Sequence, residues 1–392
     1  MTDLETRVAA PSRLRRVAPA LLGYAAVRVL GLLVLAGWSA ARGTSAHTLL
    51  TARWDALWYT RVAELGYGYE VRLPGGDIHS NLAFFPLLPW LERLLHAVTP
   101  LSYADAGFTV SLVASLAAAW GIFAVADQVY GRRAGVCAVL LWAVLPVGIV
   151  QSMAYSESLF TALAAWSLYA LLTGRWLTAG TLALLAGLTR PVGIAVVAAV
   201  WATAILFLVR ERRAGRPPTA RPVLGMLLAP LGAGGYVLWV GHRTGDGPLG
   251  YLDVQAGWRN GFDGGYAFAR FIAEMFTPLT PFPWFPPFPS ALAGVALIAG
   301  VALVIWLYVT CVRQRQPLPL LVYAGVVTAL ALCASSYFGS KPRLLMPAFP
   351  LLLPLARALA RTRTARAAGT LGAVAVLSAV YGAFWLNGSG PP

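Results

Sequence analysis

The sequence has little charge for its length. Only 11% of its 392 residues are charged and only 15 are acidic, whereas 58% are hydrophobic. A water-soluble core does not require so much apolar surface, so the composition argues against a soluble enzyme and indicates helices that face lipid. The net charge of +15 could indicate nucleic acid, but the arginines lie in short connectors and form no continuous stripe. We therefore expect membrane lipids, and no nucleic acid, as partners.

Cysteine and histidine are also scarce, and their spacing indicates neither a disulfide framework nor a metal site. The three cysteines, Cys137, Cys311 and Cys333, fall inside apolar runs and form no CxxC pair, which is typical of small buried residues. The four histidines are scattered, without HExxH or similar spacing. We expect no metal site built by the protein alone. The sequence implies no cofactor and leaves open whether a divalent cation takes part.

What is abundant is apolar sequence, arranged in eleven runs. The first, Val17–Ala41, is too long for the hydrophobic part of a signal peptide and is expected to anchor the chain. Because a bilayer requires about 20 residues, the runs 134–151 and 176–189 are short, and we expect them to be kinked or to line a cavity. The others are 106–128, 154–173, 192–209, 222–241, 291–312, 317–336, 343–360 and 367–386. The predicted fold class is an all-α polytopic membrane protein, one domain over residues 1–392, with about ten or eleven transmembrane helices.

Arginines in the short connectors predict the orientation. With a cytoplasmic N-terminus, every inner connector is short and contains arginine, as the positive-inside rule expects. These connectors contain Arg132–Arg133, Arg175, Arg210–Arg221, Arg313–Arg315 and Arg357–Arg366. The two long connectors, residues 42–104 and 242–290, then lie outside and carry most of the carboxylates. We expect a multi-pass protein of the cell membrane with an extracytoplasmic active site, although long polar loops also collect carboxylates without a function.

The first long connector is predicted to form two interfacial amphipathic helices. Apolar residues recur with a helical period over 54–65, and the aromatic, proline-broken stretch 83–95 is typical of a helix lying in the interface. A flexible turn at Pro74–Gly76 joins them. Asp55 lies at the start of the first helix, where the interface would partly desolvate it, as suits a general base. The alternative is that Asp55 is the N-cap of this helix.

Aromatic residues and misplaced cations mark the remaining outer segments. The second long connector is rich in aromatics, among them the stretch Pro281–Pro287, which could stack on sugars or anchor to headgroups. Arg190, Lys341 and Arg343 lie outside, where the positive-inside rule disfavours cations, and they would suit a lipid phosphate. Pairing with bilayer headgroups is the alternative. Arg28, near the middle of the first run, requires a partner inside the bundle, which the sequence does not identify.

Seven short segments, taken in order, resemble a known family. They are Arg53–Tyr59, Gly66–Tyr67, Ala83–Pro89, Ala154–Phe160, Gly187–Pro191, Gln255–Arg259 and Pro342–Pro347, which together spread along nearly the whole chain. In this order they resemble the PIG-V-like mannosyltransferases, which have the C-type glycosyltransferase fold. Any one segment is weak evidence, but the ordered set is fairly specific.

The resemblance implies an inverting mannosyltransferase that moves mannose from a polyprenyl-phosphate donor to a glycan, lipid or protein acceptor. Asp55 would be the general base, and Arg190, Lys341 and Arg343 would stabilise the leaving phosphate. Glu157 would orient a sugar or a loop, or pair with Arg190. The other residues that we expect to bind substrate are Trp54, Trp58, Gln255, Trp258 and Arg259.

Two further observations limit the function. No DxD motif lies near Asp55, which agrees with a lipid monophosphate donor rather than a nucleotide sugar. A lipid-linked sugar transporter or flippase is the rival hypothesis, and it predicts internal repeats, of which we find no convincing example. A non-catalytic assembly factor is a third alternative, and it would tolerate the loss of Asp55.

Overall fold

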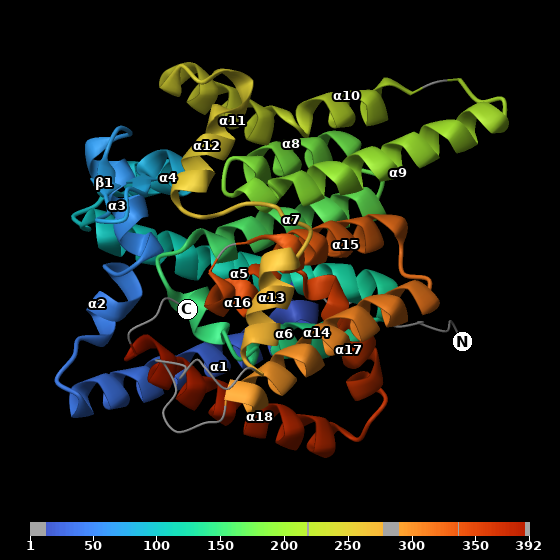
Figure 1. Cartoon of the computed structure of the whole chain (residues 1–392). Coiled ribbons are helices and arrows are strands. Elements are labelled where there is room, and N and C mark those ends of the chain that lie inside the picture. Colours follow the sequence, from blue (N-terminus) through green and yellow to red (C-terminus); the bar gives the residue numbers. More distant parts are fainter. Residues whose placement is uncertain (1–12, 218, 277–289, 336, 389–392) are drawn as a thin grey trace.

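Helices dominate the computed structural model, which describes residues 13–217, 219–276, 290–335 and 337–388 (Figure 1). Within these residues, six helical stretches are long and apolar enough to cross a bilayer, or seven if one bent pair is counted as a span. The six are α1 (Arg13–Ala41), α5 (Tyr103–Tyr130), η3 with α9 (Pro191–Gly193 and Ile194–Arg213), α10 with α11 (Ala220–Leu228 and Leu231–Thr244), α14 (Ser290–Arg313) and α18 (Thr364–Leu386). The chain is therefore a multi-pass, all-α membrane protein, as predicted.

The other apolar runs form shorter helices. These are α6 (Arg132–Ala143), α7 (Ser156–Leu172), α8 (Trp176–Gly187) and α15 (Leu318–Cys333). The bent pair consists of η5 and α16 (Phe338–Ser340 and Lys341–Leu345), followed at 74° by η6 and α17 (Phe349–Leu352 and Leu353–Ala360). Long helices are thus fewer than the apolar runs in the described part of the chain. A run buried among other helices does not have to reach the length of a bilayer, so hydropathy alone overcounts spans.

The break after α6 contains the partner of Arg28. α6 ends at Ala143, and a short segment, in which Val144 and Val147 are buried and Pro146 is exposed, leads to a 3₁₀ turn, η2 (Gly148–Ser152). The Arg28 guanidinium donates hydrogen bonds to the backbone carbonyls of Ala143 and Gly148 and lies 5.7 Å from the centre of the Tyr24 ring. Irregular backbone is tolerated at membrane depth only where protein covers it and satisfies its polar groups. The predicted partner is therefore the broken backbone itself.

The first long connector contains the two predicted amphipathic helices, as α3 (Asp55–Leu65) and α4 (Leu87–Val98). α4 buries Leu88 and Glu92 but leaves Trp90 and Leu94 more than half exposed. The connector also contains elements that we did not predict, namely α2 (Ala46–Thr51), β1 (Glu70–Arg72), β2 (Ile78–Ser80) and η1 (Asn81–Ala83). β1 and β2 form an antiparallel hairpin, and the predicted Pro74–Gly76 turn is its tip.

The second long connector packs on the first. It forms η4 (Gly247–Leu249), α12 (Gly250–Gly257) and α13 (Tyr266–Glu274), whereas the predicted aromatic stretch Pro281–Pro287 lies outside the described residues. The Trp258 indole donates to the Ser80 carbonyl over 3.0 Å, and Arg259 forms an ion pair with Asp77 at 2.7 Å. α12 is therefore held against the hairpin.

The bundle has two chemically different ends (Figure 1). At one end, which we call the arginine end, Arg16 at the start of α1 pairs with Asp127 at 2.9 Å and Arg133 donates to the Thr362 carbonyl over 3.3 Å. The opposite end, which we call the loop end, carries α2, α3 and the hairpin. The arginine-bearing connectors gather as the positive-inside pattern predicts. Which end faces the cytoplasm remains a prediction.

Candidate active site

Asp55 is the first residue of α3, at the loop end. The N-cap is Trp54, whose side chain makes no capping bond and whose φ of +52° is in the left-handed region that a bulky residue rarely adopts. The alternative that Asp55 caps this helix therefore does not describe the structure. Instead, Asp55 Oδ2 lies 2.8 Å from Arg343 Nη1 on α16, with 25% of the Asp55 side chain exposed. The strained turn thus directs the carboxylate toward a cation far along the chain.

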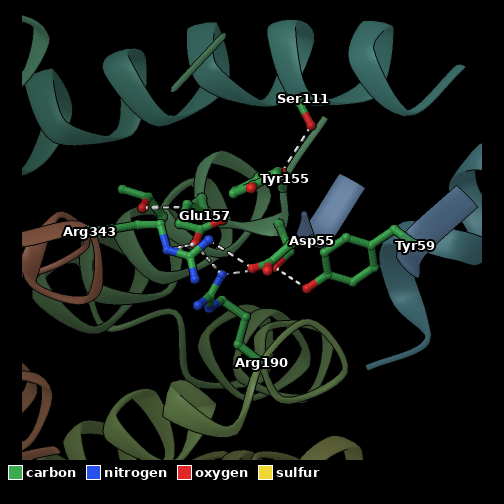
Figure 2. Close-up of polar contacts among 9 residues, drawn as sticks. Asp55, Tyr59, Ser111, Tyr155, Glu157, Arg190 and Arg343 are labelled. Carbon is green, nitrogen blue, oxygen red and sulfur yellow. Dashed lines mark hydrogen bonds and ion pairs between the residues drawn. The ribbon is translucent and has the colours of Figure 1, made fainter. Parts of the chain in front are cut away.

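Four charged side chains meet at this point, and we call Asp55, Glu157, Arg190 and Arg343 the charged cluster (Figure 2). Glu157, in the first turn of α7, is 1% exposed. Its Oε1 lies 2.5 Å from Arg190 Nη1 and 3.4 Å from Arg343 Nε. Arg343 therefore touches both carboxylates. The formal charges of the two carboxylates and the two guanidiniums sum to zero, and this pairing offsets the cost of burying Glu157.

Two hydroxyl groups join the charged cluster from neighbouring elements (Figure 2). Tyr59, one turn after Asp55 on α3, lies with its hydroxyl 2.7 Å from Ser156 Oγ, and Arg190 Nη1 donates to the same Ser156 oxygen over 3.1 Å. Burial raises the pKa of Tyr59, so the phenol remains protonated at neutral pH. We did not predict either residue as part of the site. The available signals were the i, i+4 spacing of Asp55 and Tyr59 and the position of Ser156 beside Glu157.

The start of α7 is itself held in place. Ser111 on α5 donates to the Tyr155 carbonyl over 2.9 Å, which fixes the residue just before Ser156 and Glu157. The Tyr155 ring lies under the Arg343 guanidinium, 5.2 Å from ring centre to carbon, in a cation–π contact. The cluster therefore has a rigid wall formed by α5 and the first turn of α7.

Lys341 does not join the charged cluster, although it is only two residues from Arg343. Its ammonium donates to the Ala331 carbonyl over 2.8 Å and to the Ala334 carbonyl, and it lies 5.3 Å from the centre of the Phe268 ring. These carbonyls belong to the last turn of α15 and the residue that follows it, where a cation is favourable. Its contacts are those of a helix C-terminal cap.

Trp58 and Trp258 come together one helical turn from Asp55. The Trp58 ring stacks on Phe84, with centroids 5.6 Å apart, and meets Trp258 edge-on at 4.9 Å. His79 stacks on Trp258 at 4.0 Å. The aromatic side chains thus cover much of each other's faces and form a wall beside the charged cluster. Trp54 is separate from this group, and the Arg53 guanidinium lies 4.2 Å from the centre of its ring.

Gln255 and Arg259 are not brought to the charged cluster in this structure. Gln255 Nε2 donates to the Tyr251 hydroxyl over 2.6 Å, and its Oε1 accepts from Asn260. Arg259 is largely exposed where it pairs with Asp77 near the hairpin tip. Arg259 thus joins the two long connectors, whereas the hydrogen bonds of Gln255 stay within the second. Among the described residues, no group of three His, Cys, Asp or Glu side chains could hold a metal ion.

The geometry of the charged cluster suits the transfer of a group attached to phosphate. A partly exposed carboxylate can accept a proton, and two guanidiniums next to it can each donate two parallel hydrogen bonds to phosphate oxygens. All four members lie where α3, α7, η3 and α16 meet at the loop end. Charges placed before the reaction begins require little reorganisation during it.

Comparison with known proteins gives the following similarities. Residues 83–233 match the family model described as dolichyl-phosphate-mannose-protein mannosyltransferase. This segment contains Glu157 and Arg190 but neither Asp55 nor Arg343. No curated protein sequence matches the chain.

Solved structures are similar over nearly the whole chain. ArnT from Cupriavidus metallidurans bound to undecaprenyl phosphate has a TM-score of 0.54 at 15% identity, over 91% of this chain and 62% of the ArnT chain. The oligosaccharyltransferase AglB from Archaeoglobus fulgidus, in complex with an inhibitory peptide and a dolichol-phosphate, has a TM-score of 0.47 at 13% identity. That match covers 94% of this chain and 56% of AglB. The chain thus spans less than two thirds of either protein.

Proposed function

We propose that this chain, a membrane protein with the C-type glycosyltransferase fold, transfers a sugar from a polyprenyl-phosphate donor to an acceptor hydroxyl at the loop end. The observation that carries the proposal is the contact of Asp55 with Arg343, beside Arg190 and the buried Glu157. A proton acceptor and two phosphate-binding side chains are the groups that this reaction needs. The outward orientation of the loop end is part of the proposal.

The transfer is a single displacement. The acceptor oxygen attacks the anomeric carbon from the side opposite the phosphate, Asp55 accepts the hydroxyl proton, and the bond between the anomeric carbon and the phosphate oxygen breaks. The polyprenyl phosphate leaves with the bonding electrons, and Arg190 and Arg343 stabilise the charge that develops on it. The configuration at the anomeric carbon is inverted. No acid is needed, because a phosphate is already a good leaving group.

Donor binding has to loosen the contact between Asp55 and Arg343. Phosphate oxygens compete with both carboxylates for the guanidinium, but the Asp55 side chain is 25% exposed and water can replace its lost contact. Glu157 is 1% exposed, and its release would leave an unpaired buried charge. The phosphate therefore displaces Asp55 and leaves Glu157 in place, which frees the base when the donor is bound.

For the donor sugar we propose mannose, and for its carrier a long polyprenyl phosphate. The sugar rests on the ordered motifs and on the mannosyltransferase family model that matches residues 83–233. The carrier rests on the same resemblance and on the undecaprenyl phosphate bound by the similar ArnT structure. The acceptor belongs to the class of glycans, lipids or proteins with a free hydroxyl.

The test is turnover of a polyprenyl-phosphate mannose by the purified protein in lipid nanodiscs. We expect release of polyprenyl phosphate, by transfer or by slow hydrolysis, and a loss of about 100-fold or more in Asp55→Asn. Glu64→Gln is the matched control, because Glu64 is an exposed carboxylate on the same helix. If Asp55→Asn turns over like the wild type, the base is misassigned. Counterflow of labelled donor without any product would favour the transporter alternative.

A further inference from the structure

Ser156 is the one side chain that touches both the base-bearing helix α3 and Arg190 by hydrogen bonds within the described residues. Its Oγ lies 2.7 Å from the Tyr59 hydroxyl and accepts from Arg190 Nη1 over 3.1 Å (Figure 2). Ser156 is fully buried and Tyr59 is 4% exposed, so water does not compete for these bonds. Tyr59 and Asp55 are four residues apart and therefore lie on the same face of α3.

The available protons determine the direction of the bond between Arg190 and Ser156. A guanidinium can only donate, so Ser156 Oγ accepts from Arg190 and keeps one proton and one lone pair for Tyr59. Because burial raises the pKa of Tyr59, the phenol stays protonated and can either donate to Ser156 or accept from it. In this series of hydrogen bonds, from Tyr59 through Ser156 to Arg190, each donor faces an acceptor.

Glu157 alone would hold the charge of Arg190 but not its orientation. Glu157 Oε1 lies 2.5 Å from Arg190 Nη1, the nitrogen that also donates to Ser156. A single ion pair lets the planar guanidinium turn about the shared contact, whereas a second acceptor on a different side chain restricts that rotation. Orientation matters because arginine recognises phosphate through parallel hydrogen bonds in a fixed plane. Neither contact uses Nη2.

We infer that Ser156 and Tyr59 are positioning residues, which orient Arg190 toward the leaving phosphate and fix its distance from the base on α3. The inference rests on the proposed function and assigns these two residues a role in the same site. Neither residue exchanges a proton with the substrate. Their effect acts through Arg190, and it is largest in the transition state, where the phosphate gains charge.

The experiment compares Ser156→Ala, Ser156→Thr, Tyr59→Phe and the double variant Ser156→Ala/Tyr59→Phe in the donor turnover assay. We expect Ser156→Ala to lower kcat/KM for the donor about tenfold, because a misdirected group loses much of its effect. Ser156→Thr keeps the hydroxyl and should retain most activity. The double variant should be no worse than Ser156→Ala, because both changes break one chain of bonds.

Ser158→Ala is the matched control. Ser158 is on the same turn of α7 and equally buried, but its Oγ donates to the Gln151 carbonyl over 3.3 Å rather than contacting the charged cluster. The inference is overturned if Ser156→Ala behaves like the wild type while Asp55→Asn is inactive. Equal losses in Ser156→Ala and Ser158→Ala, or additive losses in the double variant, would also overturn it, since both indicate a structural role.

A binding measurement separates this inference from the proposed function. The affinity for undecaprenyl phosphate, followed by tryptophan fluorescence, should fall about fivefold in Ser156→Ala and stay unchanged in Ser158→Ala, since an oriented guanidinium binds phosphate better. If the wild type binds this lipid but transfers no sugar, the proposed reaction fails while the positioning role is still measured. If Ser156→Ala binds the lipid like the wild type, the positioning role fails.

Discussion

Arg343 links the two carboxylates of the candidate site, because it contacts both Asp55 and Glu157. Its replacement leaves Asp55 and Glu157 facing each other with Arg190 as the remaining cation of the charged cluster. The side chain is only 9% exposed, so solvent cannot compensate. At the scale of single residues, stability and activity therefore depend on the same group.

We predict that Arg343→Gln unfolds at a lower temperature and loses donor turnover. Removing one partner of a buried ion pair costs about 3–5 kcal/mol when the other is left uncompensated, and we expect a smaller loss here because Glu157 keeps Arg190 and Asp55 is partly exposed. Arg343→Lys should not restore activity, since an ammonium cannot span two acceptors as a planar fork does. Thermal unfolding in detergent and the turnover assay measure the two effects. Arg270→Gln, which breaks an exposed pair with Glu274, is the control and should change little.

Glu92 is a second buried acid and has no contact with the charged cluster in any described interaction. It lies on α4, is 0% exposed, and neither carboxyl oxygen has a hydrogen-bond partner among the described residues. It packs so closely on α5 that a Cβ at Gly107 would lie 2.5 Å from its Oε1. Burial raises the pKa of Glu92 well above its usual value, which favours the neutral acid.

We therefore predict that Glu92 makes the protein less stable as the pH rises. The pKa of Glu92 is higher in the folded than in the unfolded chain. The stability that the protonated carboxyl contributes is therefore complete below about pH 4, the pKa in the unfolded chain. It is lost as the pH rises toward the pKa in the folded chain. Glu92→Gln should remove this dependence and raise the melting temperature most at alkaline pH. Melting curves from pH 4 to pH 9 measure the effect. Parallel curves for the two proteins would contradict it.

At the scale of elements, the break between α6 and η2 depends on one arginine and one glycine. Arg28 donates to the carbonyl of Ala143 at the end of α6 and to the carbonyl of Gly148 at the start of η2. A Cβ at Gly148 would lie 2.7 Å from the Ala143 carbonyl oxygen and 2.9 Å from Arg28 Nη2. The break is thus close-packed around the guanidinium.

We predict that Gly148→Ala destabilises the protein by about 1–3 kcal/mol, the usual cost of overpacking. The added methyl group has to push against backbone on one side and against Arg28 on the other. Gly31→Ala is the control, because Gly31 lies one turn after Arg28 on α1 and a Cβ there meets nothing within 4 Å. Thermal unfolding of both variants decides the matter, and a similar melting temperature for the two would refute the prediction.

The whole molecule is polarised between its arginine end and its loop end. The connector between α9 and α10 lies at the arginine end, far from the hairpin tip (Figure 1). The positive-inside rule places the arginine end in the cytoplasm. With this predicted orientation, the proposed reaction would take place outside the cytoplasm.

We predict that cysteines placed at the two ends react from opposite sides of the membrane. A membrane-impermeant maleimide should label Pro74→Cys in intact cells and should label Ala214→Cys only after permeabilisation. Both positions are exposed, whereas Cys137 and Cys311 are buried and Cys333 is partly buried, so labelling of the wild type is subtracted as the background. Labelling of Ala214→Cys in intact cells would contradict the predicted orientation and would indicate that the charged cluster lies on the cytoplasmic side.

The sequence by itself determined the class of the molecule and the helices at its loop end. Composition and apolar runs indicate membrane helices, a helical period located α3, and an aromatic, proline-broken stretch located α4, because these signals are local. The same locality explains the excess of predicted spans: an apolar run has the same composition whether lipid or protein covers it. The hairpin was missed because its strands have only three residues each and show no alternation long enough to detect.

Only the tertiary structure decided which charges meet, apart from the pair of Glu157 with Arg190, which was one alternative predicted from the sequence. Asp55 and Arg343 are 288 residues apart, and nothing local distinguishes Arg343 from Lys341, whose ammonium binds the end of α15 instead. The roles of Tyr59 and Ser156, and the backbone partner of Arg28, likewise depend on how helices pack. Periodicity and composition describe each segment separately, whereas a site requires directions and distances between segments. Those are set by the packing of the whole bundle, and this is why the sequence predicted a base and several cations but not their arrangement.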